Sequence, residues 1–321
     1  MITNTELEYK GDQFPSKIIS FNQDVDNVFF YTENNVVLKI TILRDSMIRF
    51  RYTTKGYFNK DFSYAIDKGQ SHGYNELNVE EHKTFYTITT SKIVCKINKE
   101  NAKVSIFDLE GFQILDDEIG FHWEESYEFG GNIVKMSKKA NDGECYYGMG
   151  DKATHLNLKG KRVENWATDQ YAFHRDQEPL YKVVPFYIGL HHNKAYGIFF
   201  DNTFRTFFDF CHERRNVTSF WAEGGEMNYY FIYGPKMKDV VTNYTHLTGK
   251  PELPPMWTLG YHQCKWSYYP ESKVKEITST FRKLQIPCDA IYLDIDYMDG
   301  FRCFTWDKER FPDPKRMVSE L

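Results

Sequence analysis

Apolar and polar residues alternate along much of the chain, from about residue 36 to residue 233. The run Ile48–Tyr52 is an example, because its apolar side chains alternate with Arg49 and Arg51. A period of two is typical of a β-strand that buries one face and turns the other towards water. The pattern therefore predicts a region built from strands.

Turn residues such as Gly224-Gly225 separate these alternating runs, and no helical pattern lies between them. Many short strands without intervening helices favour a β-sandwich. Besides the run at Ile48–Tyr52, the segments that read as strands are 84–98, 102–108, 194–202, 204–210 and 226–234.

The pattern changes after the segment "GKPELPPMW", which contains three prolines and a glycine. Such a stretch is typical of a linker. We therefore predict two domains, a sandwich at residues 1–250 and a second domain that begins at residues 251–321.

The second domain begins with a strand, a helix and a strand. "TLGYHQ" reads as a short strand, and residues 270–285 show helical periodicity between Pro270 and Pro287. The run "CDAIYLDI", residues 288–295, has the continuous apolar character of a parallel strand buried on both faces. Together they predict one right-handed crossover unit. The apolar face of the predicted helix consists of Val274, Ile277, Phe281 and Leu284.

A long stretch without regular pattern, Asp151–Pro179, interrupts the strands. Irregular segments of this length are uncommon inside compact domains and tend to be functional, although a plain surface excursion is the alternative. Gly148-x-Gly150, just before it, is not a dinucleotide-binding fingerprint, because the third glycine and a following helix are absent.

Composition narrows the class of partner. The 321 residues carry 40 Lys and Arg against 45 Asp and Glu, which gives a formal charge of -5. There is no basic excess for nucleic acid, so a small or neutral partner is expected. The aromatic content of 17% suits packing within sheets and also stacking on sugar rings.

The six cysteines lie far apart and form no Cys-x-x-Cys pair, which argues against a disulfide framework and against a zinc site. The chain also lacks a leader-like start and an apolar run of roughly 18 residues. These features predict a cytoplasmic protein without a membrane partner.

Two carboxylates, Asp294 and Asp296, fall at the end of the predicted strand 288–295, where parallel sheets bind their ligands. If the strand stays extended, both can point to the same side. The pair suits magnesium-dependent phosphoryl transfer, sugar recognition, or a turn without function. A calcium loop does not fit, because its template requires acids at Met298 and Thr305.

The surrounding motifs decide between these alternatives. "GYHQCKWSYYP", "DIDYMDG", "FTWD" and "FPDP" follow one another as in glycoside hydrolase family 31, the retaining α-glucosidases, and the chain closely resembles that family. Upstream, "YYGMGDK", "NWATD" and "EPLYKVVPFYIGL" resemble the amino-terminal sandwich of the family and the loop that it sends to the active site.

The resemblance implies a galactose-mutarotase-like β-sandwich followed by a (β/α)8 TIM barrel. Only the sandwich and about two barrel strands have counterparts here, so the chain is expected to be an amino-terminal part, truncated within the barrel. The nucleophile and acid/base aspartates of the family follow its fourth and sixth barrel strands, and we expect both beyond Leu321. The resemblance implies no catalytic residue in this chain, no metal and no organic cofactor.

The resemblance also implies substrate-binding residues. Asp294 would accept hydrogen bonds from the distal hydroxyls of the glucose unit being removed, and Ile295 would line the same pocket. Trp266 would lie beside that glucose. Asp169 or Asp176 would place a carboxylate near the leaving-group sugar, and the varying loop length leaves both as candidates. The sequence "DIDYM" favours glucose over xylose.

The expected function is thus the amino-terminal portion of a retaining α-glucosidase that acts on α-gluco-oligosaccharides. Within the family, an α-transglucosylase, an α-glucan lyase, a sulfosugar hydrolase or an α-xylosidase is an alternative. Outside it, the alternatives are a non-catalytic carbohydrate-binding sandwich and a magnesium-dependent phosphotransferase, which would leave Trp266 unexplained. Homo-oligomerisation is left open.

Overall fold

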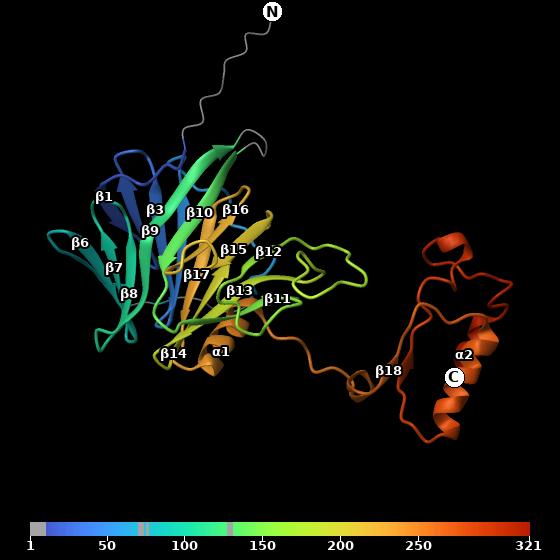
Figure 1. The fold of residues 1–321 in the computed structure, drawn as a ribbon. Coiled ribbons are helices and arrows are strands. Elements are labelled where there is room, and N and C mark those ends of the chain that lie inside the picture. The colour runs from blue at the N-terminus through green and yellow to red at the C-terminus, as the bar shows by residue number, and fades with distance from the viewer. Residues whose placement is uncertain (1–10, 70–73, 75–76, 127–130) are drawn as a thin grey trace, which may run out of the picture. The chain divides into compact units, whose positions relative to one another are not determined.

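The computed structural model describes residues 11–69, 74, 77–126 and 131–321, which form two compact units that divide between Lys250 and Pro251 (Figure 1). The first unit consists of two antiparallel β-sheets that face each other, with one helix on the outer face of one sheet. It is therefore a β-sandwich, as the alternating pattern predicts.

The eight-stranded sheet has the order β1 (Ile18–Gln23), β2 (Asn27–Thr32), β3 (Val37–Arg44), β4 (Met47–Thr53), β17 (Met227–Tyr233), β14 (Lys194–Phe200), β13 (Val183–His191), β11 (Cys145–Gly150). The nine-stranded sheet has the order β12 (Arg162–Asn165), β15 (Thr206–Phe210), β16 (Val217–Ala222), β10 (Gly131–Lys139), β9 (Gln113–Ser126), β8 (Val104–Asp108), β7 (Ile93–Asn98), β6 (Phe85–Thr89), β5 (Val79–Glu81).

Aromatic side chains fill much of the space between the two sheets. Phe50 of β4 stacks on Tyr229 of β17, with ring centroids 5.0 Å apart. From the other sheet, Phe220 of β16 meets Tyr229 edge-on at 5.5 Å. All three side chains are fully buried. Each such aromatic contact stabilises a core by about 0.5–1.5 kcal/mol beyond the burial of its area.

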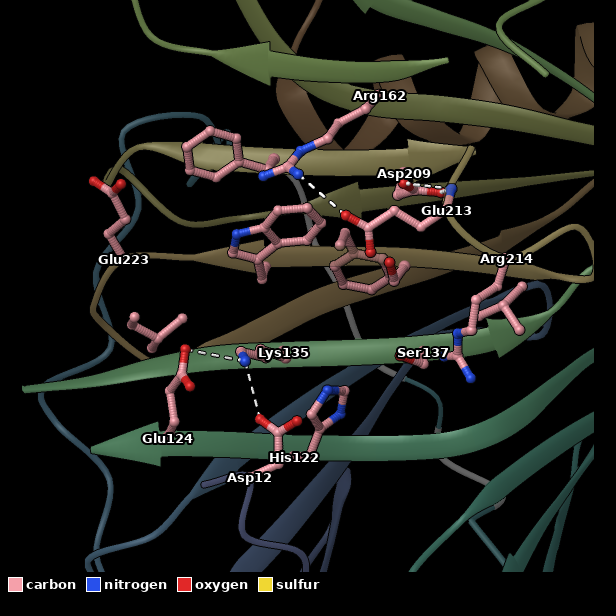
Figure 2. A pocket seen from close by; sticks show the side chains of 16 residues that line it. Asp12, His122, Glu124, Lys135, Ser137, Arg162, Asp209, Glu213, Arg214 and Glu223 are labelled. Carbon is pink, nitrogen blue, oxygen red and sulfur yellow. Dashed lines mark hydrogen bonds and ion pairs between the residues drawn. The ribbon is translucent and has the colours of Figure 1, made fainter. Parts of the chain in front are cut away.

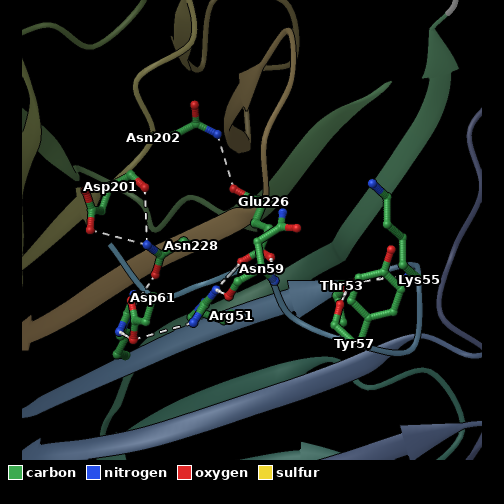
Figure 3. Close-up of polar contacts among 11 residues, drawn as sticks. Arg51, Thr53, Lys55, Tyr57, Asn59, Asp61, Asp201, Asn202, Glu226 and Asn228 are labelled. Atoms are coloured by element: carbon green, nitrogen blue, oxygen red, sulfur yellow. Dashed lines mark hydrogen bonds and ion pairs between the residues drawn. The ribbon is translucent and has the colours of Figure 1, made fainter. Parts of the chain in front are cut away.

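The strand β4 does not have the water-facing side that its alternation predicts. Arg49 and Arg51 are only 9% and 5% exposed. Arg49 donates to both carboxylate oxygens of Asp61 at 2.7 and 2.8 Å. Arg51 forms an ion pair with Glu226, the residue just before β17 (Figure 3). The prediction is wrong because the segment after β4 folds back over this face, and a guanidinium tolerates burial when its charge is paired.

A second ion pair lies in the core itself. Lys138 of β10 and Asp117 of β9 are 1% and 0% exposed, and their charged atoms lie 2.5 Å apart. The Lys138 ammonium also donates to the Tyr229 hydroxyl at 2.9 Å, and Asp117 accepts the backbone N–H of Val104 at 2.8 Å. Burial raises the pKa of Asp117, and the Lys138 charge opposes that rise. Each charge is thus tolerated in the core because the other is present.

The helix α1 (Met237–Thr248) packs on the outer face of the eight-stranded sheet. Val240 is fully buried there, and Tyr244 stacks on Phe186 of β13 with ring centroids 3.9 Å apart. Gly197 of β14 permits this close approach, because a Cβ at that position would lie 2.8 Å from the Val240 side chain. This helix was not predicted from the sequence.

The second unit contains β18 (His262–Gln263), α2 (Glu271–Lys283), β19 (Ala290–Ile291) and α3 (Pro314–Glu320), with 3₁₀ turns at Met256–Leu259 and Asp299–Phe301. The predicted strand, helix and strand are present, and β18 pairs with β19 in parallel. The buried residues of its core are Tyr268, Val274, Phe311 and Met317.

Two expectations for the second unit are wrong. The run 288–295 is not buried on both faces: Ile291 packs against the small core, whereas Tyr292 is 48% exposed. Leu284 lies beyond the last turn of α2 and is 60% exposed. The strand β19 is only two residues long, and it contributes Ile291 to the core that Val274 of α2 and Met317 of α3 share.

Candidate functional site

Two glycines direct the chain out of the sheet and into the segment Asp151–Pro179. Gly148 and Gly150 of β11 have φ angles of 121° and 78°, and the register of β11 against β13 shifts between them. A Cβ on Gly150 would lie 2.4 Å from the carbonyl oxygen of Lys182, so no side chain fits there. The Gly-x-Gly pattern therefore marks a β-bulge, which ends regular pairing.

The segment is less irregular than predicted. Residues Arg162–Asn165 form β12, which pairs with β15 at the edge of the nine-stranded sheet. Val163 is buried in the core between the sheets, and this burial fixes the strand. The remaining residues form turns around β12 and carry the two candidate aspartates.

Asp176 is held within this segment. Its carboxylate accepts hydrogen bonds from the Thr154 hydroxyl at 2.5 Å and from the Lys161 ammonium at 2.9 Å. Its backbone N–H donates to the carbonyl of Ala153 at 2.8 Å. The two side-chain hydrogen bonds lower the pKa of Asp176 to about 2. Asp176 thus ties two parts of the segment together.

Removing the Lys161 ammonium should raise the pKa of Asp176. We expect its carboxyl to titrate near pH 2 in the parent chain, and in Lys161→Met to move towards the ordinary aspartate value of about 3.9. The carboxyl ¹³C shift measured against pH reports this midpoint. Lys159→Met, an exposed lysine in the same turn, is the control. An identical midpoint in parent and Lys161→Met would show that the ion pair does not form in solution.

Asp169 differs from Asp176. It is exposed, and within the described part of the chain its carboxylate has no hydrogen-bond or ion-pair partner. A carboxylate that is hydrated and unpaired can accept hydrogen bonds from a ligand without breaking existing ones. Of the two candidates, Asp169 is therefore the one whose side chain is available.

The carboxyl end of β19 turns sharply at Asp294. The strand ends at Ile291, and Asp294 has a φ of 59°, in the left-handed region that aspartate tolerates better than most residues. Asp294 and Asp296 therefore do not lie on one extended strand, the condition for both to point the same way. In the described residues the Asp294 carboxylate has no partner, and Ile295 beside it is 41% exposed.

Asp296 holds the indole ring of Trp266. The indole N–H donates to the Asp296 carboxylate at 3.0 Å, and Arg310 donates to the carbonyl oxygen of Asp296 at 3.0 Å. The Arg310 guanidinium lies 4.3 Å from the ring centroid of Tyr269. Trp266 is 75% exposed, so this network presents an aromatic face beside the turn of Asp294. Asp296 is thus engaged by Trp266 and Arg310, whereas the Asp294 carboxylate has no such partner among the described residues.

The roles of Asp296 and Arg310 were missed in the sequence. Asp296 was considered only as a ligand alongside Asp294, and Arg310 belongs to "ERFPDP", where no pattern points to a partner 14 residues earlier. The two halves of the predicted site lie in different compact units. Their assembly around one substrate, with Asp169 or Asp176 near Asp294 and Trp266, stays a prediction.

Both units match models of known domains. The glycosyl hydrolase 31 N-terminal galactose mutarotase-like domain matches residues 37–209, which is more than half of the chain. The chain belongs to glycoside hydrolase family 31. The glycosyl hydrolases family 31 TIM-barrel domain matches residues 251–321. The resemblance and the fold class, a mutarotase-like sandwich followed by the beginning of the family barrel domain, are confirmed.

Similar proteins extend this assignment. Alpha-glucosidase 2 of Bacillus thermoamyloliquefaciens is 35% identical over 298 residues, which cover 92% of this chain and 37% of that protein. An alpha-glucosidase of Saccharolobus solfataricus is 38% identical over 60% of this chain and 28% of its own length. A mutant family 31 dextranase of Flavobacterium johnsoniae, complexed with isomaltotriose, has a TM-score of 0.88 at 32% identity, covering 96% of this chain and 37% of its own. The chain thus spans about a third of the length of these relatives.

Proposed function

We propose that this chain is the amino-terminal portion of a retaining α-glucosidase that removes terminal glucose from α-linked gluco-oligosaccharides. The observation that supports this most is the turn at Asp294. A carboxylate without a partner among the described residues follows a parallel strand there, in the same unit as the exposed ring of Trp266. Carboxylates that accept from vicinal hydroxyls, together with an aromatic ring, are the groups that recognise a sugar.

The substrate class follows from the relatives. Two of them are named alpha-glucosidases, and the dextranase binds isomaltotriose. In this proposal Asp294 orients the glucose unit through its distal hydroxyls, Ile295 and Trp266 line the pocket, and Asp169 lies nearer the leaving-group sugar. These residues act through binding and orientation rather than bond-making. A cytoplasmic location remains a prediction. Among the described residues, no helix is long and apolar enough to span a membrane.

The bond-making groups of the proposal are two carboxyl groups about 5 Å apart, one a nucleophile and one an acid and base, acting through a covalent glycosyl-enzyme. We place both in the two thirds of the relatives that this chain does not cover. Another family activity, such as α-glucan lyase or α-transglucosylase, would use the same binding residues and differ in those other parts.

The 321-residue chain alone should therefore release no product from an aryl α-glucoside, whereas the complete protein should release α-glucose with retained configuration. Absorbance of the freed phenol and ¹H NMR of the first product anomer measure both. Turnover by the purified 321-residue chain would show that it contains its own catalytic pair. An inactive complete protein, or an unsaturated product, would overturn the glucosidase assignment.

A further inference from the structure

A pocket of about 440 Å³ lies on the outer face of the nine-stranded sheet, over β12, β15, β16, β10 and β9. Figure 2 shows side chains ringing it, with Arg162 and Glu223 on one side and Lys135, Glu124 and Asp12 on the other. The pocket belongs wholly to the first unit and shares no residue with the predicted substrate site of the second.

Each cation that lines this pocket already has an anionic partner. Lys135 lies 2.9 Å from Asp12 and 3.0 Å from Glu124 (Figure 2). Arg162 pairs with Glu213 at 3.2 Å. The remaining lining cation, Arg214, pairs with Glu118 at 3.1 Å. His122 adds no charge near neutral pH, because burial lowers its pKa. These pairings partly neutralise the cations, and so weaken the attraction of the pocket for a phosphate or carboxylate ligand.

Several polar groups of the pocket are unpaired instead. Among the described residues, no partner contacts the carboxylate of Glu223, the indole N–H of Trp221, or the hydroxyls of Ser137 and Ser219. They include both donors and acceptors of hydrogen bonds. Neutral groups that both donate and accept hydrogen bonds, such as sugar hydroxyls, can satisfy all of them.

The ring of Trp221 is fixed in place. It stacks on Phe207 of the neighbouring strand, with centroids 5.2 Å apart and planes inclined by 15°. The Arg162 guanidinium lies 4.8 Å from its centroid. Glu213, which pairs with Arg162, sets the position of that guanidinium in turn. The ring is thus preorganised, and preorganised groups lose little conformational entropy when they bind.

We propose that this pocket is a non-catalytic binding site for a neutral saccharide. Glu223 would accept from two neighbouring hydroxyls, Trp221 would donate from its indole N–H, and Ser137 and Ser219 would exchange hydrogen bonds with the remaining hydroxyls. Such a site would hold a gluco-oligosaccharide on the sandwich independently of the proposed catalytic pocket.

The chain has six tryptophans, and the NMR resonance of one indole, that of Trp221, tests the proposal. In a ¹⁵N-labelled 321-residue chain, the indole resonance of Trp221 is assigned by its loss in Trp221→Phe. Maltotriose should shift that resonance saturably, with a Kd on the order of 1 mM, as expected for a shallow site. ATP, the anionic probe, should leave it unchanged. Thermal unfolding confirms that each variant is folded.

Two variants locate the binding. Glu223→Gln keeps the shape of the side chain but loses the charge, so the Kd for maltotriose should rise roughly fivefold to tenfold. Trp221→Ala should abolish the saturable shifts that maltotriose causes in the resonances of Ser137 and Ser219. Glu33→Gln, an exposed glutamate in the β2–β3 turn, is the matched control and should bind as the parent does.

Trp266→Ala separates this proposal from the proposed function, because it removes the aromatic ring of the other site and should leave the Trp221 titration unchanged. A Trp221 resonance that does not move up to roughly 20 mM maltotriose would overturn the proposal. So would an equal response to ATP, or a Glu223→Gln variant that binds as tightly as the parent.

Discussion

The Asp294→Asn variant of the complete enzyme is expected to lose roughly one to two orders of magnitude in kcat/KM for α-glucosides. A hydrogen bond between a carboxylate and a sugar hydroxyl contributes about 1.5–3 kcal/mol when water is excluded, and the substitution replaces the charge by a neutral acceptor. Asparagine tolerates the left-handed backbone at this position, so the turn itself should survive. Initial rates with an aryl α-glucoside measure the loss.

Asp289→Asn is the matched control. Asp289 lies just before β19, at the opposite end of the strand from Asp294, and is exposed. Barrel enzymes build their chemistry at the carboxyl ends of the strands, so the control should keep kcat/KM within about twofold. Equal kinetics for Asp294→Asn and the parent would show that Asp294 only terminates the strand.

Replacing Lys138 by methionine is expected to lower the free energy of unfolding by about 3–5 kcal/mol. The substitution leaves Asp117 with an unpaired charge at 0% exposure and removes a donor from the Tyr229 hydroxyl. Urea denaturation of the 321-residue chain, followed by far-UV circular dichroism, measures the difference. Lys139→Met is the matched control, because the neighbouring Lys139 is 59% exposed and pairs with Asp116 at the surface. Lys139→Met should lower the free energy of unfolding by less than about 1 kcal/mol.

Protonation of Asp117 gives a second test of the same ion pair. Without Lys138, burial should hold the pKa of Asp117 far above its unfolded value of about 3.9, so the folded state binds a proton that the unfolded state releases at neutral pH. The free energy of unfolding that Lys138→Met loses relative to the parent should therefore become smaller as the pH falls from 7 to 5. The double variant Lys138→Met with Asp117→Leu should recover most of the stability. A deficit independent of pH would mean that lost packing, not the unpaired carboxylate, is responsible.

The sequence predicted the strand-rich region and, within it, the strands β4, β6, β7, β8, β14, β15 and β17, because these runs alternate or are rich in β-branched and aromatic residues. Among the strands that it did not name are β1, whose burial pattern is irregular, and β2, whose apolar run Val28–Tyr31 does not alternate in sequence although its burial does. It also missed α1. Val240, Tyr244 and Leu247 have the spacing of a helical face and could have revealed that helix. The burial of Arg49 could not be predicted, because it depends on Asp61 folding back over β4, a contact that no local pattern encodes.

The candidate site was predicted from motifs. A motif identifies residues, but it does not show which hydrogen-bond or ion-pair partners their side chains have. Asp169 and Asp176 are equivalent in sequence, and only the tertiary contacts of Thr154 and Lys161 distinguish the engaged carboxylate from the available one. Likewise, the sequence predicts that Asp294 and Asp296 act as a pair on one strand, whereas the left-handed backbone at Asp294 ends the extended conformation.

The left-handed backbone at Asp294 restricts the range of residues that the position can accept. In a saturation library of the complete enzyme, the φ of 59° should penalise β-branched and aromatic residues irrespective of their chemistry. Glycine would fit the backbone without offering an acceptor, whereas glutamate would keep the charge at the expense of the turn. Selection for folding and selection for turnover should therefore enrich different residues, with folded clones dominated by aspartate, asparagine and glycine, and active clones by aspartate alone.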